Sequence, residues 1–269
     1  NQCPQFQQRS RDLFRPSLEG KLVAVTVERV ANRMDSPKFA QVGVRLRRFF
    51  EDAASGFDGL GFCLSSERDQ LSQWRGYADD GRGVALGFDA KKLSEFIENY
   101  ESIPTKPQLF RVWYEEQEHD DAVEPIVHDL ASLLNLIDPP RGAMPDRRSE
   151  QERNASPVEV KAARWSAALK QRALIDNLFR LKPKAFQEEK EWRIVSTVHE
   201  EHQLHRDYRV RDSKIVPYRQ IKFGPPELMP LRSVCLGPKH PTPDEVVASM
   251  LKSMGHSGVV VERSAASYR

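Results

Sequence analysis

Short apolar runs and amphipathic segments alternate only loosely along this sequence, and that irregular order is the strongest constraint on its fold. A parallel α/β fold needs a regular succession of strand, helix and strand, which is absent here. Apolar residues at helical spacing predict helices over residues 37–54, 67–78, 90–100, 120–137, 157–180 and 243–255. Alternating or short apolar runs predict strands over residues 60–66, 83–89, 108–114, 191–198, 233–238 and 258–264, with a hairpin over 208–218. The pattern therefore predicts an α+β fold.

The length of 269 residues suits one large domain or two small ones, and we expect a single domain over residues 1–269. Residues 138–156 are rich in proline, charge and small polar side chains, which is typical of a flexible loop. Helices are expected on both sides of this loop. We therefore expect a helical insertion over about residues 115–182.

The composition predicts a protein of the cytoplasm. The 41 basic and 39 acidic residues leave a net charge of +2, which favours neither nucleic acid nor any other charged partner. No apolar run is long enough to cross a bilayer, so no membrane partner is expected. Three widely spaced cysteines form neither a zinc motif nor a disulfide framework, and we expect Cys63 and Cys235 to be small buried hydrophobic residues.

The first block with chemical potential is QLSQWRGYADDGRGVALGFD, residues 70–89. On a helix, Trp74 and Tyr77 share a face that could stack a planar ligand, with Arg75 beside them to meet a phosphate. Ser66 is a candidate N-cap of this helix. The alternative is that both aromatic residues belong to the core. The glycines of this block lack a dinucleotide-binding spacing and are expected to serve a turn and a close backbone approach.

The second block is FQEEKEWRIVSTV, residues 186–198, which reads as a strand with charged residues at alternate positions. Alternation would place Glu189, Glu191 and Arg193 on one face and Trp192 on the other, buried one. An arginine beside a carboxylate lowers its pKa and keeps it ionised, which suits stabilisation of a sugar cation. The alternative is an exposed edge strand in which Glu and Arg merely pair.

Other polar clusters carry weaker signals. His199, His202 and His205 recur every three residues, but no carboxylate pattern frames them, and we expect no metal site. Lys239 in the segment GPK could meet an anion, although an ordinary turn is the simpler interpretation.

Taken in order, these blocks resemble the bacterial family known as domain of unknown function 2971. The residues that carry the resemblance are CLSSERDQLSQWRGYADDGRGVALGFD, KPKAFQEEKEWRIV, KIVPY, VCLGPK and SAASYR. The family is similar in turn to the ADP-ribosyltransferase fold, an α+β domain in which a split, bent mixed β-sheet flanked by helices clasps NAD. The family usually opens with a block resembling Y-x-Y-T-S, which has no counterpart here, so that NAD-holding element lies either upstream of Asn1 or is lost.

The resemblance implies an ADP-ribosyltransferase-like enzyme with NAD as its substrate and no metal. Glu191 would stabilise the ribosyl cation and Glu189 would guide the acceptor. Trp74 and Tyr77 would wall the nicotinamide pocket, while Arg75 and Arg193 would meet the pyrophosphate or order Glu191. The acceptor would be a protein or a nucleic acid, and the setting a bacterial toxin or anti-phage defence system with a possible partner protein. The alternative functions are a catalytically inactive ligand-sensing or partner-binding module of the same fold, and a nucleic-acid-binding protein that uses arginine-rich stretches.

Overall fold

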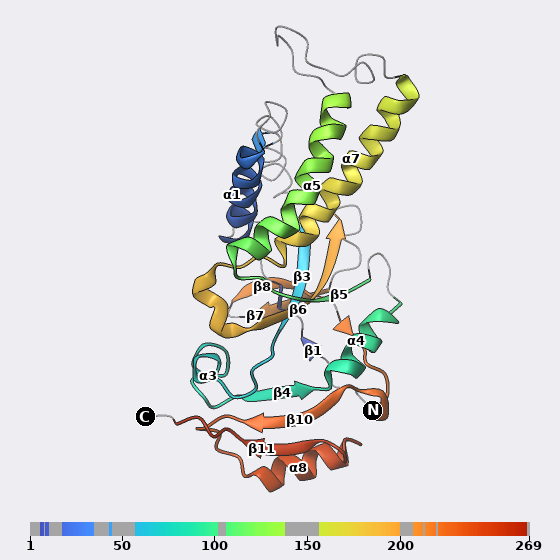
Figure 1. The fold of residues 1–269 in the computed structure, drawn as a ribbon. Helices are drawn as coiled ribbons and strands as arrows, with labels where there is room; N and C mark the ends of the chain where they lie inside the picture. Colours follow the sequence, from blue (N-terminus) through green and yellow to red (C-terminus); the bar gives the residue numbers. More distant parts are fainter. Residues whose placement is uncertain are drawn as a thin grey trace. The chain divides into compact units, whose positions relative to one another are not determined.

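The computed structural model describes ten stretches of the chain, which fall into two compact units. The described residues are 6–7, 9–10, 18–34, 43–44, 57–101, 106–137, 156–199, 207–211, 213–218 and 220–267. The first unit comprises Asn1–Ser10, Leu60–Phe110 and Glu188–Arg269, and the second comprises Arg11–Gly59 and Arg111–Gln187. Figure 1 follows the chain through both units.

The first unit contains small open sheets. A four-stranded sheet has the order β2 (Arg9–Ser10), β3 (Phe57–Ser65), β6 (Glu191–His199) and β5 (Gln108–Arg111). A three-stranded sheet has the order β11 (Val260–Arg263), β10 (Leu231–Leu236) and β4 (Val84–Phe88), with β10 parallel to β11 and antiparallel to β4. The three-stranded sheet therefore contains both a parallel and an antiparallel pair, which agrees with the expected mixed β-sheet.

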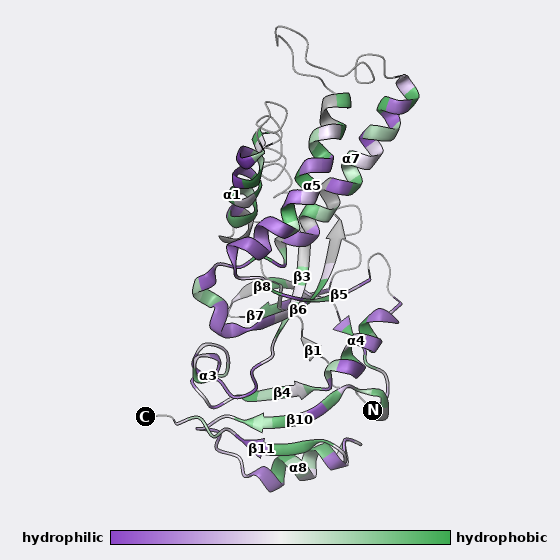
Figure 2. Ribbon diagram, in the orientation of Figure 1, coloured by the Kyte–Doolittle hydropathy of each residue, from purple (hydrophilic) through white to green (hydrophobic). Residues whose placement is uncertain are grey.

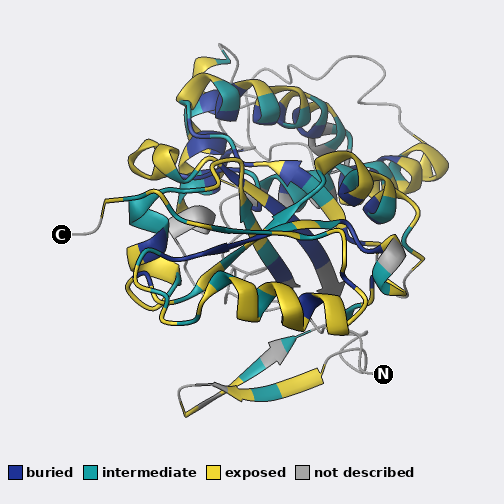
Figure 3. Ribbon diagram, turned by 90° about the horizontal axis from the view of Figure 1, so that it is seen from below, coloured by how far each residue is buried: buried dark blue, intermediate teal, exposed yellow. Residues whose placement is uncertain are grey.

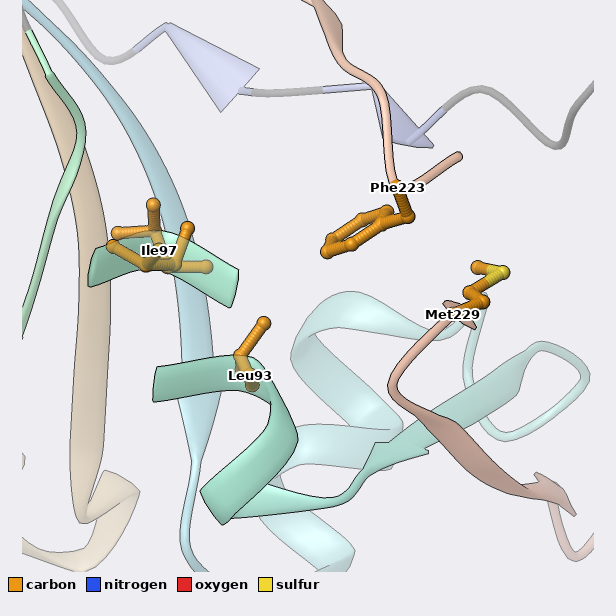
Figure 4. Close-up of a cluster of buried hydrophobic side chains, with 5 residues drawn as sticks. Leu93, Ile97, Phe223 and Met229 are labelled. Atoms are coloured by element: carbon orange, nitrogen blue, oxygen red, sulfur yellow. The ribbon is translucent and has the colours of Figure 1, made fainter. Parts of the chain in front are cut away.

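Helix α4 (Ala90–Glu98) supplies the core of the first unit. Asp89 directly precedes the helix, where aspartate is a favoured N-cap, and it accepts a hydrogen bond from the backbone N–H of Lys92 at 3.0 Å. Its residues Leu93 and Ile97 pack with Ile194, Phe223 and Met229 (Figure 4). Partly buried side chains from β3, β4, β5 and β10 complete the cluster. Burial of this apolar surface on α4 is what holds the two sheets of the unit together.

Helix α8 (Asp244–Ser253) covers the three-stranded sheet. Its Leu251 packs against Val234 and Leu236 of β10, which is apolar along its second half in Figure 2. Pro243 stands at the N-cap, and Gly255 follows the helix with φ at +88°, so the expected helix bounds are confirmed.

Two short ribbons complete the first unit. Strands β7 (Asp207–Arg211) and β8 (Lys214–Tyr218) pair antiparallel, which confirms the expected hairpin. Strands β1 (Phe6–Gln7) and β9 (Gln220–Ile221) form the second, also antiparallel pair.

The second unit is built from helices α1 (Leu18–Arg33), α5 (Glu116–Ile137) and α7 (Pro157–Leu178), which pack on one another. Ser156 caps α7 through a capping box with Glu159, which fixes where the helix begins. The buried residues recur at helical spacing on each helix: Val23, Val27, Val30, Val123, Val127, Leu130, Ala163, Ala167 and Leu174. Their other faces are exposed, as the two-coloured helices of Figure 3 illustrate.

The structure is mixed α+β, as the sequence predicts, with the helices expected over 120–137 and 157–180 in place. The division into two units leaves the single-domain expectation as a prediction. The helix expected over 37–54 lies outside the described residues except for the helical Gly43 and Val44, and so does the expected loop up to residue 155. No helix in the described part of the chain is both long and apolar enough to span a bilayer.

Candidate functional site

Glu191 and Arg193 form a buried ion pair at the start of strand β6. The Arg193 guanidinium donates from Nε to Glu191 Oε1 at 2.9 Å and from Nη2 to Oε2 at 3.0 Å. Both side chains are almost fully buried, at 2% relative exposure for each residue. Residues two apart on a strand project from the same face, so the pairing follows from the local sequence. A two-pronged contact of this kind fixes both the orientation and the charge of the carboxylate.

Glu189 does not continue the strand, and the expectation that it alternates with Glu191 is wrong. It ends a 3-10 helix, Lys184–Glu189, and strand β6 begins only at Glu191. Lys190 between them has φ at +41°, a left-handed conformation that breaks the alternation of side chains. Glu189 is half-buried, so its carboxylate is in a different setting from the buried one two residues later.

The strand also differs from expectation at Trp192, which is 37% exposed rather than buried. Burial on β6 instead runs continuously from Arg193 through Ile194 and Val195 to Ser196. Both faces of the strand are therefore covered over residues 193–196, and buried and exposed residues alternate only at residues 191–193.

The segment 65–70 is fastened to the turn before β6, which brings the two sequence blocks together. Ser65 Oγ donates to the carbonyl of Glu189 at 2.8 Å. The backbone N–H of Ser66 donates to the carbonyl of Lys190 at 3.1 Å, and Gln70 Nε2 donates to that of Glu188 at 2.7 Å. Sequence reasoning alone had no means of finding these contacts, since they join residues more than 110 positions apart.

Helix α3 (Leu71–Tyr77) carries the aromatic residues of the first block. Trp74 is buried at 3% exposure, whereas Tyr77 is 45% exposed and Arg75 is also exposed. The two aromatic side chains are therefore in different environments, although they lie three apart on the helix. Gln70 is the N-cap residue and makes no side-chain cap, so the expected Ser66 cap is wrong.

Asp69 is a residue of this region to which the sequence analysis assigned no role at the candidate site. Its carboxylate accepts hydrogen bonds from Trp74 Nε1 at 2.6 Å, from Ser264 Oγ and from the backbone N–H of Ala265 at 2.7 Å. Burial opposes its ionisation, but these donors outweigh that effect and hold the pKa of Asp69 below its ordinary value. Asp69 thereby fixes the indole of Trp74 and ties it to the closing SAAS segment of the sequence.

The loop after α3 packs closely against the backbone of residues 237–239. Gly81 has φ at +83°, and Lys239 donates its backbone N–H to the Gly81 carbonyl at 2.9 Å. A Cβ at Gly237 would lie 2.3 Å from that same carbonyl oxygen. Lys239 Nζ also pairs with Asp80 at 2.8 Å, so GPK serves as the turn that the sequence suggested. The expected role of the glycines in a turn and a close approach is confirmed.

The structure thus pairs Glu191 with Arg193 and joins residues 65–70 to the backbone at 188–190. Trp74 is buried against Asp69, while Arg75 and Tyr77 are exposed on the same helix. Among the described residues, no group of three or more histidine, cysteine, aspartate and glutamate side chains is arranged to hold a metal. His202 and His205 lie outside the described residues.

Residues 73–194 match the model of a family described as "Protein of unknown function (DUF2971)", and the match supports the family resemblance over those residues. The matched span includes Trp74, Tyr77, Glu189, Glu191 and Arg193. No curated protein and no solved structure matches the chain.

Proposed function

We propose that this protein is an ADP-ribosyltransferase-like enzyme that transfers ADP-ribose from NAD to a protein or nucleic-acid acceptor. The observation that carries the proposal is the carboxylate of Glu191 at the start of β6. Its two oxygens are held by hydrogen bonds from Nε and Nη2 of Arg193. Further support comes from residues 65–70, which lead into the helix of Trp74 and Tyr77 and bind the backbone at 188–190, directly before Glu191 in sequence.

The proposed reaction breaks one bond of NAD and forms one bond to the acceptor. The bond between ribose C1′ and the nicotinamide nitrogen breaks, and nicotinamide leaves with the electron pair. The positive charge that develops on the ribose is stabilised by the fixed negative charge of Glu191. A nucleophilic oxygen or nitrogen of the acceptor then bonds to C1′, and its proton passes to Glu189, which acts as a general base.

The burial of Glu191 sets a condition on this reaction. At 2% exposure, its carboxylate cannot meet a ribose unless the turn at Lys190, with its left-handed backbone, moves when substrate binds. Closure and opening of such segments are common in enzymes. Arg193 would keep Glu191 charged throughout, and Arg75 would meet the pyrophosphate.

The same burial favours one other function, a non-catalytic binding module of this fold. A carboxylate whose two oxygens both accept from one guanidinium is suited to a structural role in a strand. In that case Tyr77 and Arg75 would bind a ligand without turnover, as a sensor or as a surface for a partner protein. The bacterial cytoplasm, as a toxin or anti-phage defence effector, is the proposed setting for either function.

The test is the release of free nicotinamide from NAD by the full chain. We expect turnover that falls roughly a hundredfold or more in Glu191→Gln, the size of effect seen when a transition-state stabiliser is removed. Because this variant breaks a buried pair, Glu189→Gln and Tyr77→Ala provide a second pair of tests at less buried positions. Each is expected to lower kcat/KM while the melting temperature stays near that of the wild type.

Two matched control variants test whether a loss of activity comes from the proposed site or from changing any exposed side chain of the same type. Glu188→Gln alters the exposed glutamate next to Glu189, and Tyr208→Ala removes an exposed tyrosine from the β7–β8 hairpin. Both should retain full activity. Saturable NAD binding without nicotinamide release would assign the protein to the non-catalytic alternative, and absence of both would reject the NAD-based proposal altogether.

A further inference from the structure

The outer face of helix α7 carries a stripe of exposed apolar side chains that no described residue covers. Trp165 is 71% exposed, Val158 is 77% exposed and Leu169 is 56% exposed. With the exposed Ala162 they stand at spacings of four, three and four residues. Such spacing places them in one line along a helix, as in the contact seam of a coiled coil.

This stripe is on the opposite side of α7 from the face that packs within its own unit. Ala163, Ala167 and Leu174 are buried, and they follow the same alternation of spacings shifted by about half a turn. The helix therefore has two apolar faces, one packed within its own unit and the other exposed to solvent. Of the large apolar residues Trp165, Leu169 and Leu174 on this helix, only Leu174 is in the core.

Basic side chains flank the exposed stripe. Lys161 and Arg164 are both exposed, and neither forms an ion pair with any residue that the structure describes. By contrast, Lys170 on the same helix is already neutralised by Asp129 at 2.6 Å, and Glu159 is engaged in the capping box with Ser156. The uncompensated charge next to Trp165 is thus positive, which makes a second copy of this positively charged stripe a poor partner.

We propose that the outer face of α7 docks an acidic amphipathic helix of a partner protein. The apolar side of that helix would cover Trp165 and Leu169, and its acidic flanks would meet Lys161 and Arg164. A tryptophan surrounded by smaller apolar residues is the kind of side chain that dominates binding energy at such interfaces. This inference is independent of the proposed chemistry at Glu191, since α7 contributes no residue to that site.

A designed pair of probes tests the proposal. One is a synthetic 21-residue helical peptide with leucine at the a and d heptad positions and glutamate at e and g, labelled for fluorescence anisotropy. The other has the same leucines with lysine in place of each glutamate. The full chain should bind the acidic peptide and discriminate against the basic one by about tenfold or more.

Variants locate the binding on α7. Trp165→Ala should weaken binding of the acidic peptide about 30-fold, the loss typical of a central interface tryptophan. Lys161→Glu combined with Arg164→Glu should remove the preference for the acidic peptide. Lys252→Glu on α8, an exposed lysine in the other unit, is the matched control and should leave binding unchanged.

Three results would overturn the proposal. The first is a failure to select the acidic peptide. A transient interface is expected to have a dissociation constant of about 1 μM, so either no binding of the acidic peptide at a concentration 100-fold higher or equal binding of both peptides would show this failure. The second is self-association of the chain that Trp165→Ala abolishes, which would assign the stripe to a second copy. The third is binding of a single-stranded oligonucleotide at the same face with Trp165→Ala and the double charge reversal both lowering its affinity.

Discussion

Asp69 shows how one carboxylate organises the region around the candidate site. It accepts from the Trp74 indole, the Ser264 hydroxyl and the Ala265 backbone N–H, which join helix α3 to the segment after β11. Asp69 is half-buried, and an acceptor held by several donors is costly to replace, because each donor then loses its partner. The residue thus controls where Trp74 lies without itself being placed to touch a substrate.

Asp69→Asn is expected to lower the free energy of unfolding by about 1–3 kcal/mol, since an amide must turn an N–H group toward existing donors. Because the folded-state pKa is lowered, the charged Asp69 stabilises the protein above the ordinary value of 3.8, and that contribution is lost as the pH falls through the lower folded value. Urea titrations between pH 7 and pH 3 measure both effects. Asp79→Asn, at an exposed aspartate after α3, is the control; an equal loss in both variants would contradict this role of Asp69.

The described cysteines differ in their environment, contrary to the expectation that both are buried. Cys63 is exposed on β3, whereas Cys235 is buried on β10. Burial, reinforced by the nearby charge of Asp69, raises the pKa of the Cys235 thiol to about 11. Only thiolates react readily with alkylating reagents.

Iodoacetamide at pH 8 should therefore modify Cys63 and spare Cys235 in the native protein, and modify both after denaturation. Peptide mass spectrometry in a Cys3→Ser background measures the two sites separately. Native labelling of Cys235 at the rate of Cys63 would show that β10 is not buried as the structure has it.

At the scale of the element, strand β6 is the unusual one, because it begins with a buried ion pair instead of apolar residues. Removing one partner of such a pair leaves the other charge buried, which costs about 3–5 kcal/mol. Replacing both with apolar residues of similar size avoids that penalty. The stability of β6 therefore depends on the two residues as a unit.

A double-mutant cycle measures this coupling. Glu191→Leu and Arg193→Met are each expected to destabilise the fold strongly, while the variant with both changes should cost much less than the sum of the single changes. The comparison uses the free energy of unfolding in urea. Simple additivity would mean that the two side chains do not act together.

The elements that the sequence predicts correctly are those decided by local interactions. The Asp89 cap of α4, the glycine after α8 and the β7–β8 hairpin depend on residues close in sequence. The errors arise where distant residues decide the outcome. Ser66 and Asp69 are engaged by partners beyond the helix, and the turn at Lys190 separates Glu189 from the strand. Periodicity also cannot say which of two apolar faces of α7 is the buried one.

At the scale of the whole molecule, each compact unit has its own interior. In the second unit, the buried carboxylate of Asp120 on α5 pairs with Arg29 and Arg33 of α1. Together with the pair between Arg29 and Glu116 at 3.6 Å, this cluster joins two helices that also contribute buried apolar residues. The candidate site depends instead on contacts within the first unit, between residues 65–70, 188–193 and 264–265.

Asp120→Asn should accordingly raise hydrogen exchange in α1 and α5, because two arginines lose a charged partner, and leave β4 and β10 protected. Exchange followed by mass spectrometry resolves these elements. The control is Asp121→Asn, at the exposed neighbour on the same helix. Equal deprotection of all four elements would contradict the existence of separate interiors.

The central claim is that NAD binds beside Trp74 and Glu191. Its most direct test is a titration of the ¹⁵N-labelled protein with NAD up to about 1 mM, the upper end of common substrate affinities, observed at the indole N–H signals of the four tryptophans. If NAD binds there, the Trp74 signal should shift until it saturates, while the signals of Trp113 and Trp165 should not change. A Trp74 signal that stays in place throughout, or shifts of all four signals without saturation, would contradict it.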